Sequence, residues 1–194
     1  MGAREAAVRS RWFVSLPHRR IPLRTALLAL AVAIAVLTAA TARLFLWPAQ
    51  GLPGKVSAIV MLAGPGDLLS RAVDLARTGR APFLVISLGK PQSGNQCPPR
   101  IPGVKLVCFN PVPASTQGEA EFVGRLARRH DWRSVALVTI TPQDTRARLR
   151  IERCFPGRVY VVTAPPDPTQ TNWPYQIVYQ WGALFKALIL QRSC

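Results

Sequence analysis

The feature that most constrains this chain is an uncharged apolar run near its N-terminus. No charged residue occurs from Thr25 to Ala42, and residues 44–47 extend the run past Arg43 before Pro48 stops it. A span of about 20 apolar residues crosses a bilayer, and a cation near its end can reach the headgroups. The run therefore predicts a transmembrane anchor over residues 25–47.

The residues before the anchor predict its orientation. Segment 1–24 holds one acidic residue, Glu5, against six arginines: Arg4, Arg9, Arg11, Arg19, Arg20 and Arg24. Basic flanks stay in the cytoplasm, so we expect a single-pass plasma-membrane protein with a cytoplasmic N-terminus and an extracytoplasmic domain. A cleaved signal peptide is the alternative, because Ala40-Thr41-Ala42 has the small-x-small form of a cleavage site.

The formal net charge of +16 raises the question of nucleic-acid binding. Nucleic-acid binders gather basic residues on one element and interleave aromatic side chains for stacking, and neither pattern occurs here. The densest basic cluster instead ends where the apolar run begins. That position favours a membrane surface as the partner and predicts no nucleic-acid partner.

After a linker at residues 48–55, residues 56–194 are long enough for one domain. Short apolar runs predict buried strands at 58–63, 83–87, 105–109, 135–139 and 159–162. Helical spacing predicts helices at 68–78, 116–130, 142–154 and 175–190, with a Thr116–Glu119 capping box and Thr141 as a cap. This alternation is typical of an α/β fold, a Rossmann-like three-layer domain with a mostly parallel sheet.

All four cysteines follow the apolar run, and an even number in an exported domain favours disulfides. Cys97 and Cys108 enclose a short loop, so we expect them to pair, and Cys154 to pair with Cys194. Free buried thiols are the alternative. Because the chain has no Cys-x-x-Cys and only two histidines, it predicts no metal site of the zinc type.

Polar and glycine residues gather where the predicted strands end. These candidate ligand-binding residues are Gly64, Asp67, Arg71, Ser87, Gly89, Ser115, Thr116, Glu119, Thr139, Gln143 and Arg146. Carboxyl ends of parallel strands share one edge of the sheet, so an anion-binding site is expected there.

We predict that Arg71, Glu119 and Arg146 form one polar site, while Arg148 and Arg150 lie on a more exposed helix face. Each motif also has an ordinary structural reading, as a turn, a cap or a solvated helix face.

Four ordered motifs resemble the YdcF-like domain family, which includes the SanA-like and ElyC-like envelope proteins. They are residues 59–64 with Arg71-Ala72, residues 81–89, residues 115–120, and residues 137–139 with Arg146-Ala147. The resemblance covers residues 56–162. It implies an α/β domain with a polar pocket at the strand ends and a role in peptidoglycan-precursor or lipid-carrier metabolism.

Two positions depart from the family pattern. Gln143 stands where the family usually has a histidine, and an amide cannot act as a general acid or base. Gly118 stands beside Glu119 where a polar partner is usual. The sequence thus predicts a membrane-anchored protein that binds or processes a phosphate-bearing envelope intermediate, or alternatively a non-catalytic binding or scaffold module of the envelope. No cofactor is assigned.

Overall fold

The computed structural model describes residues 22–49, 51, 54–89, 96–164 and 172–194. They fall into two compact units, one ending at Leu37 and one comprising Thr38–Cys194. Helix α1 (Leu23–Thr41) continues into a π-helical turn, η1 (Ala42–Leu46). Within the described ranges, Leu23–Leu46 is the one helix long and apolar enough to cross a membrane. The basic segment 1–21 lies outside those ranges.

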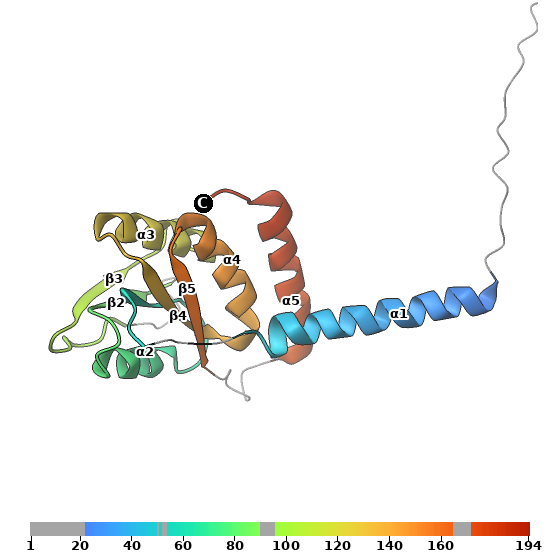
Figure 1. The fold of residues 1–194 in the computed structure, drawn as a ribbon, viewed down its shortest axis with the longest axis horizontal. Helices are drawn as coiled ribbons and strands as arrows, with labels where there is room; N and C mark the ends of the chain where they lie inside the picture. Colours follow the sequence, from blue (N-terminus) through green and yellow to red (C-terminus); the bar gives the residue numbers. More distant parts are fainter. Residues whose placement is uncertain (1–21, 50, 52–53, 90–95, 165–171) are drawn as a thin grey trace, which may run out of the picture. The chain divides into compact units, whose positions relative to one another are not determined.

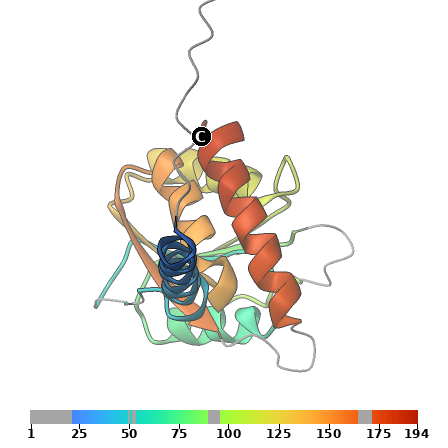
Figure 2. The same cartoon turned by 90° about the vertical axis from the view of Figure 1, so that its right-hand side faces the viewer.

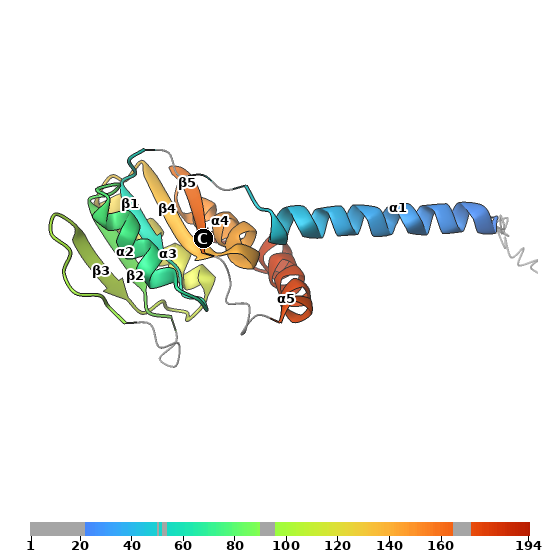
Figure 3. The same cartoon turned by 90° about the horizontal axis from the view of Figure 1, so that it is seen from below.

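The second unit contains a five-stranded parallel sheet in the order β3-β2-β1-β4-β5 (Figures 1 and 3). Its strands are β1 (Ala58–Met61), β2 (Phe83–Ser87), β3 (Lys105–Phe109), β4 (Ser134–Ile140) and β5 (Arg158–Ala164). Ala58 of the central strand lies opposite both Phe83 and Val135. The predicted Rossmann-like α/β class is therefore confirmed.

The side chains of the central strand alternate between two hydrophobic cores. Ala58 and Val60 face α3 (Thr116–Arg129) and α4 (Asp144–Cys154), whereas Ile59 and Met61 face α2 (Leu68–Arg77). Figure 3 shows α2 on one face of the sheet and α3 with α4 behind it. Because helices cover both faces, β1 is fully buried, which explains its continuous apolar sequence.

The helix starts differ from two sequence predictions. The cap of α3 is Ser115, whose Oγ accepts a hydrogen bond from the Gly118 amide at 3.3 Å, so the predicted Thr116–Glu119 capping box is wrong. Thr141 does not cap α4 either. It begins a 3₁₀ turn, η3 (Thr141–Gln143), and α4 starts only at Asp144. The Thr116 side chain is instead buried, and its hydroxyl accepts hydrogen bonds from Gln143 and Arg146.

The last helix, α5 (Trp173–Phe185), continues into a π-helical turn, η4 (Lys186–Leu190), and packs on α4. Arg150 donates from Nη1 to the Gln191 carbonyl at 2.6 Å, and Arg153 donates from Nη1 to the Ala187 carbonyl at 2.6 Å. Since the last carbonyls of a helix lack intrahelical donors, arginines are suitable partners. Arg150 is therefore buried, and its predicted exposure is wrong; Arg148 is half-buried.

Both predicted disulfides are present. Cys97, in the chain before β3, pairs with Cys108 of β3. Cys154 at the end of α4 pairs with Cys194. Their Cα atoms are 5.9 and 4.9 Å apart, respectively, within the usual range for a crosslink. The second bridge and the arginine contacts hold the C-terminal helix against α4.

Candidate functional site

A polar cluster lies at the carboxyl ends of β1 and β4. From β1 the chain adds β2 and β3 on one side of the sheet, and it then crosses to the other side of β1 to add β4 and β5. The direction in which strands are added therefore reverses between β1 and β4. In open parallel sheets, ligands bind in the crevice outside the strand ends at such a reversal. The cluster therefore occupies the position at which this fold class places its binding sites.

Glu119 is the buried carboxylate of the cluster, with only 2% of its surface exposed. Its Oε1 accepts a hydrogen bond at 2.7 Å from the amide of Ala63, two residues after the end of β1. Burial raises the pKa of Glu119, while the Ala63 amide, the Ser87 hydroxyl and the charge of Arg146 lower it in that order. A carboxyl group of this kind is held in one orientation and takes up a proton more readily than an exposed glutamate.

Arg146 is the cation of the cluster. Its Nη1 donates to Thr116 Oγ1 at 2.7 Å, and its Nε donates to Gln180 Oε1 at 3.2 Å on α5. The guanidinium lies 6.0 Å from the centre of the Tyr179 ring. Burial lowers the pKa of Arg146, and Tyr179 and Glu119 oppose that effect. Among the described residues, Nη2 has no hydrogen-bond partner, so this end of the fork can bind an anion.

Gln143 completes the cluster beside Gly64. The amide is only 6% exposed, and its Nε2 donates to Thr116 Oγ1 at 3.5 Å. A Cβ atom at position 64 would lie 3.3 Å from Gln143 Oε1, so a glycine lets the chain after β1 pass close to this side chain. Gln143 can donate and accept hydrogen bonds, but it cannot transfer a proton.

The predicted residues divide into two groups. Those brought together are Gly64, Ser87, Thr116, Glu119, Gln143 and Arg146, and Thr139 is buried where β4 ends. Asp67 and Ser115 are exposed caps of α2 and α3, and Gly89 has a φ of 70° after β2. Arg71 is exposed in the second turn of α2. Its membership of the site stays a prediction.

Sequence reasoning missed the contribution of α5. Gln180 is 2% exposed and orients Arg146, while Tyr179 lies beside the guanidinium. A glutamine in the middle of an apolar helix was the available signal, because a buried amide requires hydrogen-bond partners. In the part of the chain that the structure describes, no group of three or more His, Cys, Asp or Glu could hold a metal ion.

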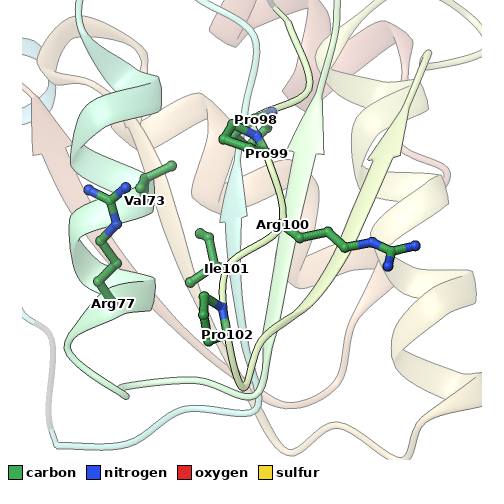
Figure 4. A pocket seen from close by; sticks show the side chains of 7 residues that line it. All are labelled: Val73, Arg77, Pro98, Pro99, Arg100, Ile101 and Pro102. Carbon is green, nitrogen blue, oxygen red and sulfur yellow. The ribbon is translucent and has the colours of Figure 1, made fainter.

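Two hollows lie away from this cluster. One, of about 110 Å³, lies between α2 and the chain before β3, and in Figure 4 Arg100 extends away from Val73 and Ile101. Its lining residues are Val73, Arg77, Pro98, Pro99, Arg100, Ile101 and Pro102. Ligand pockets usually enclose about 300 Å³ or more, so this hollow is too small for a metabolite. The other, a groove of about 660 Å³, includes Arg133 and Arg158 at the amino ends of β4 and β5, the edge opposite the cluster.

Asp144, at the start of α4, is a second buried carboxylate and was not predicted. It is 1% exposed, its Oδ1 lies 3.8 Å from Arg148 Nε, and its Oδ2 has no hydrogen-bond partner among the described residues. Burial raises the pKa of Asp144 from about 3.8 to about 6, although Arg148 and then Arg43 lower it. At neutral pH the domain therefore contains an ionised carboxylate whose burial is only partly compensated.

The Asp144→Asn variant should be more stable than the wild type at pH 7.5, by at most about 3 kcal/mol for a pKa raised by about two units. Between about pH 4 and pH 6, Asp144 is protonated in the folded chain but already ionised in the unfolded chain. The stability due to that proton is present below pH 4 and is lost as the pH rises through 6. Denaturant unfolding across this range measures the slope.

The matched control is Asp74→Asn on the exposed side of α2. It should reproduce the pH dependence of the wild type, including the part that arises from Glu119. Parallel pH profiles for the wild type and Asp144→Asn would contradict the assignment to Asp144.

Comparisons with known proteins identify no family for this chain. The sequence matches no protein-family model, and no curated protein matches it. Two solved structures of pantothenate synthetase from Thermus thermophilus share 18% sequence identity with this chain, each with a TM-score of 0.30. The alignment covers 59% of this chain and 57% of the synthetase chain. Nothing about the activity of this domain follows from a likeness of this size.

Proposed function

We propose that the domain binds a phosphate-bearing molecule of the cell envelope, a lipid carrier or a peptidoglycan precursor, at the cluster around Arg146 and Glu119. The observation that carries this proposal is the fixed guanidinium of Arg146. Thr116 and Gln180 orient it, and one end of its fork has no partner among the described residues. An oriented guanidinium binds phosphate through two parallel hydrogen bonds with little loss of conformational entropy.

The proposed location is the outer face of the plasma membrane, with the N-terminus in the cytoplasm. Two disulfides support an oxidising compartment, since crosslinks of this kind are rare in the cytosol. The apolar helix Leu23–Leu46 supports attachment to a membrane. The resemblance to YdcF-like envelope proteins is in keeping with both.

A non-catalytic binding module is the second candidate, and Gln143 favours it. This amide contacts Thr116 at the centre of the cluster, where a proton-transferring side chain would be needed. If the domain is an enzyme, Glu119 is the carboxylate of the cluster that could act as a general base, because its pKa is raised and it lies beside Arg146.

Arg146→Ala should abolish phosphate-ligand binding by the full chain. The test is a thermal-shift screen with inorganic phosphate, polyprenyl phosphate and nucleotide-sugars, followed by titration of whichever compound stabilises the wild type. At a concentration 100 times Kd, a specific ligand adds about 2.7 kcal/mol of stability, which is easily detected. Loss of the fixed guanidinium should remove this stabilisation.

Two control variants test other causes of lost binding in Arg146→Ala. One removes a positive charge elsewhere, and the other disturbs the contact between Arg146 and α5. Arg129→Ala removes an exposed arginine at the end of α3 and should bind as the wild type does. Gln180→Ala breaks the same contact with α5 but leaves the guanidinium, so it should weaken binding without abolishing it. Equal losses in Arg146→Ala and Arg129→Ala, or no stabilising compound in the screen, would overturn the proposal.

A further inference from the structure

The outer face of α5 and η4 exposes large apolar side chains along its whole length. They are Tyr175, Val178, Tyr179, Phe185, Leu188, Ile189 and Leu190, with Val178 73% and Phe185 60% exposed. A surface helix normally places polar residues on its outer side. Figure 2 shows α5 crossing the front of the domain. Large exposed apolar side chains grouped along one helix mark an interaction surface.

The orientation of this helix is fixed from behind. Gln180, Leu184 and Ala187 are buried against the domain, and Arg146 and Arg153 hydrogen-bond to α5 and η4 from α4. The bridge between Cys154 and Cys194 ties the end of the chain to the same place. The apolar face is therefore presented outward in the folded domain and does not result from a loosely attached helix.

The position of α5 indicates what covers this face. Trp181 donates from Nε1 to Thr41 Oγ1 at 3.1 Å, and its ring packs edge-on against Phe45 at 5.3 Å. Thr41 and Phe45 belong to the domain and are also among the last residues of the candidate span Leu23–Leu46. The helix thus packs on the part of the apolar segment that meets the domain, where the chain would leave the bilayer.

Charge distinguishes a bilayer from a second copy of the chain. No aspartate or glutamate occurs from Asn172 to Cys194, and the exposed Lys186 lies next to Phe185. In a symmetric helix pair, whether parallel or antiparallel, Lys186 of each copy would find no acidic partner on the facing helix. At a membrane surface, each lysine extends to anionic headgroups while tyrosines occupy the polar boundary.

We propose that the outer face of α5 and η4 lies in the headgroup region of the membrane, with Val178, Phe185 and Ile189 reaching the acyl chains. This contact would hold the domain against the bilayer surface beside its anchor, as interfacial amphipathic helices do. It depends on Leu23–Leu46 spanning the membrane but not on ligand binding by the Arg146 cluster.

Spin labels on added cysteines test this contact in the full chain. Val178→Cys and Phe185→Cys place a label on the face, and Asp74→Cys places one on the exposed side of α2. The four native cysteines are crosslinked, so the added thiol is the one that reacts. The protein is reconstituted in vesicles of phosphatidylethanolamine and phosphatidylglycerol, and the accessibility of each label to oxygen and to a water-soluble nickel chelate is measured.

Labels at positions 178 and 185 should show a ratio of oxygen to nickel accessibility several-fold above that of the label at position 74. Equal ratios at all three positions would overturn the proposal, because the face would then lie in water. Spin–spin broadening at positions 178 and 185 that disappears on dilution with unlabelled chain would overturn it in favour of a second copy. Neither readout changes if the phosphate screen finds no ligand.

Discussion

Gly118→Ala should destabilise the domain by about 3 kcal/mol or more, because the space that a Cβ atom would need is already filled by backbone. A Cβ atom at position 118 would lie 2.0 Å from the Pro113 carbonyl oxygen and 2.8 Å from the Val112 carbonyl carbon. Extra atoms in a well-packed core cost about 1–3 kcal/mol and occasionally more, and here the obstacle is backbone, which cannot move aside as a side chain can. Denaturant unfolding of the full chain in detergent measures the loss.

The matched control is Gly182→Ala on α5, where a Cβ atom would meet nothing within 4 Å. Alanine is favoured over glycine in a helix by about 1 kcal/mol, so this variant should be as stable as the wild type or slightly more stable. A similar loss of stability in both variants would show that the close approach at Gly118 is not the cause.

The same glycine matters for the candidate site. Gly118 lies between Thr116 and Glu119, and its amide donates to the cap Ser115. A shift of the first turn of α3 would displace the hydroxyl that orients Arg146. Position 118 has no polar side chain, unlike the YdcF-like proteins that the sequence resembles, and the structure gives a steric reason, since a Cβ atom there would meet the backbone of Val112 and Pro113.

The strands could be predicted from the sequence because local signals agree with tertiary burial. β2 and β3 begin and end at the predicted residues, since proline or glycine bounds each apolar run on at least one side. The edge at which polar residues gather followed from parallel pairing alone. What the periodicity could not supply was the partner of each side chain.

Glu119 illustrates that limit. Three residues after Thr116 it has the spacing of a capping box, but its carboxylate accepts from the Ala63 amide, 56 residues away in the sequence. Arg150 likewise lies in an arginine-rich stretch that predicts a solvated helix face, yet its guanidinium is buried and donates to the carbonyl and the side-chain oxygen of Gln191. Both contacts depend on how elements distant in the sequence pack, and no local pattern encodes that.

Cys194→Ser should lower the free energy of unfolding by about 4 kcal/mol, the largest effect expected of any single crosslink in this domain. The bridge to Cys154 closes a loop of 40 residues, and the entropy that a crosslink removes from the unfolded chain grows with loop length. Because Cys194 is exposed while Cys154 is buried, replacing Cys194 removes the bridge and leaves the core unchanged. The shift in the guanidinium chloride midpoint measures the effect.

Cys97→Ser is the matched control, since Cys97 is also exposed and its bridge to Cys108 closes only 11 residues. Its expected cost is about 3 kcal/mol, and that loss should leave α5 protected. In Cys194→Ser, by contrast, only noncovalent contacts such as those of Arg146, Arg150 and Arg153 retain α5 and η4 on α4. Amide hydrogen exchange in α5 should therefore accelerate in Cys194→Ser and not in Cys97→Ser. Unchanged exchange in both variants would show that the arginine contacts alone hold the C-terminal helix in place.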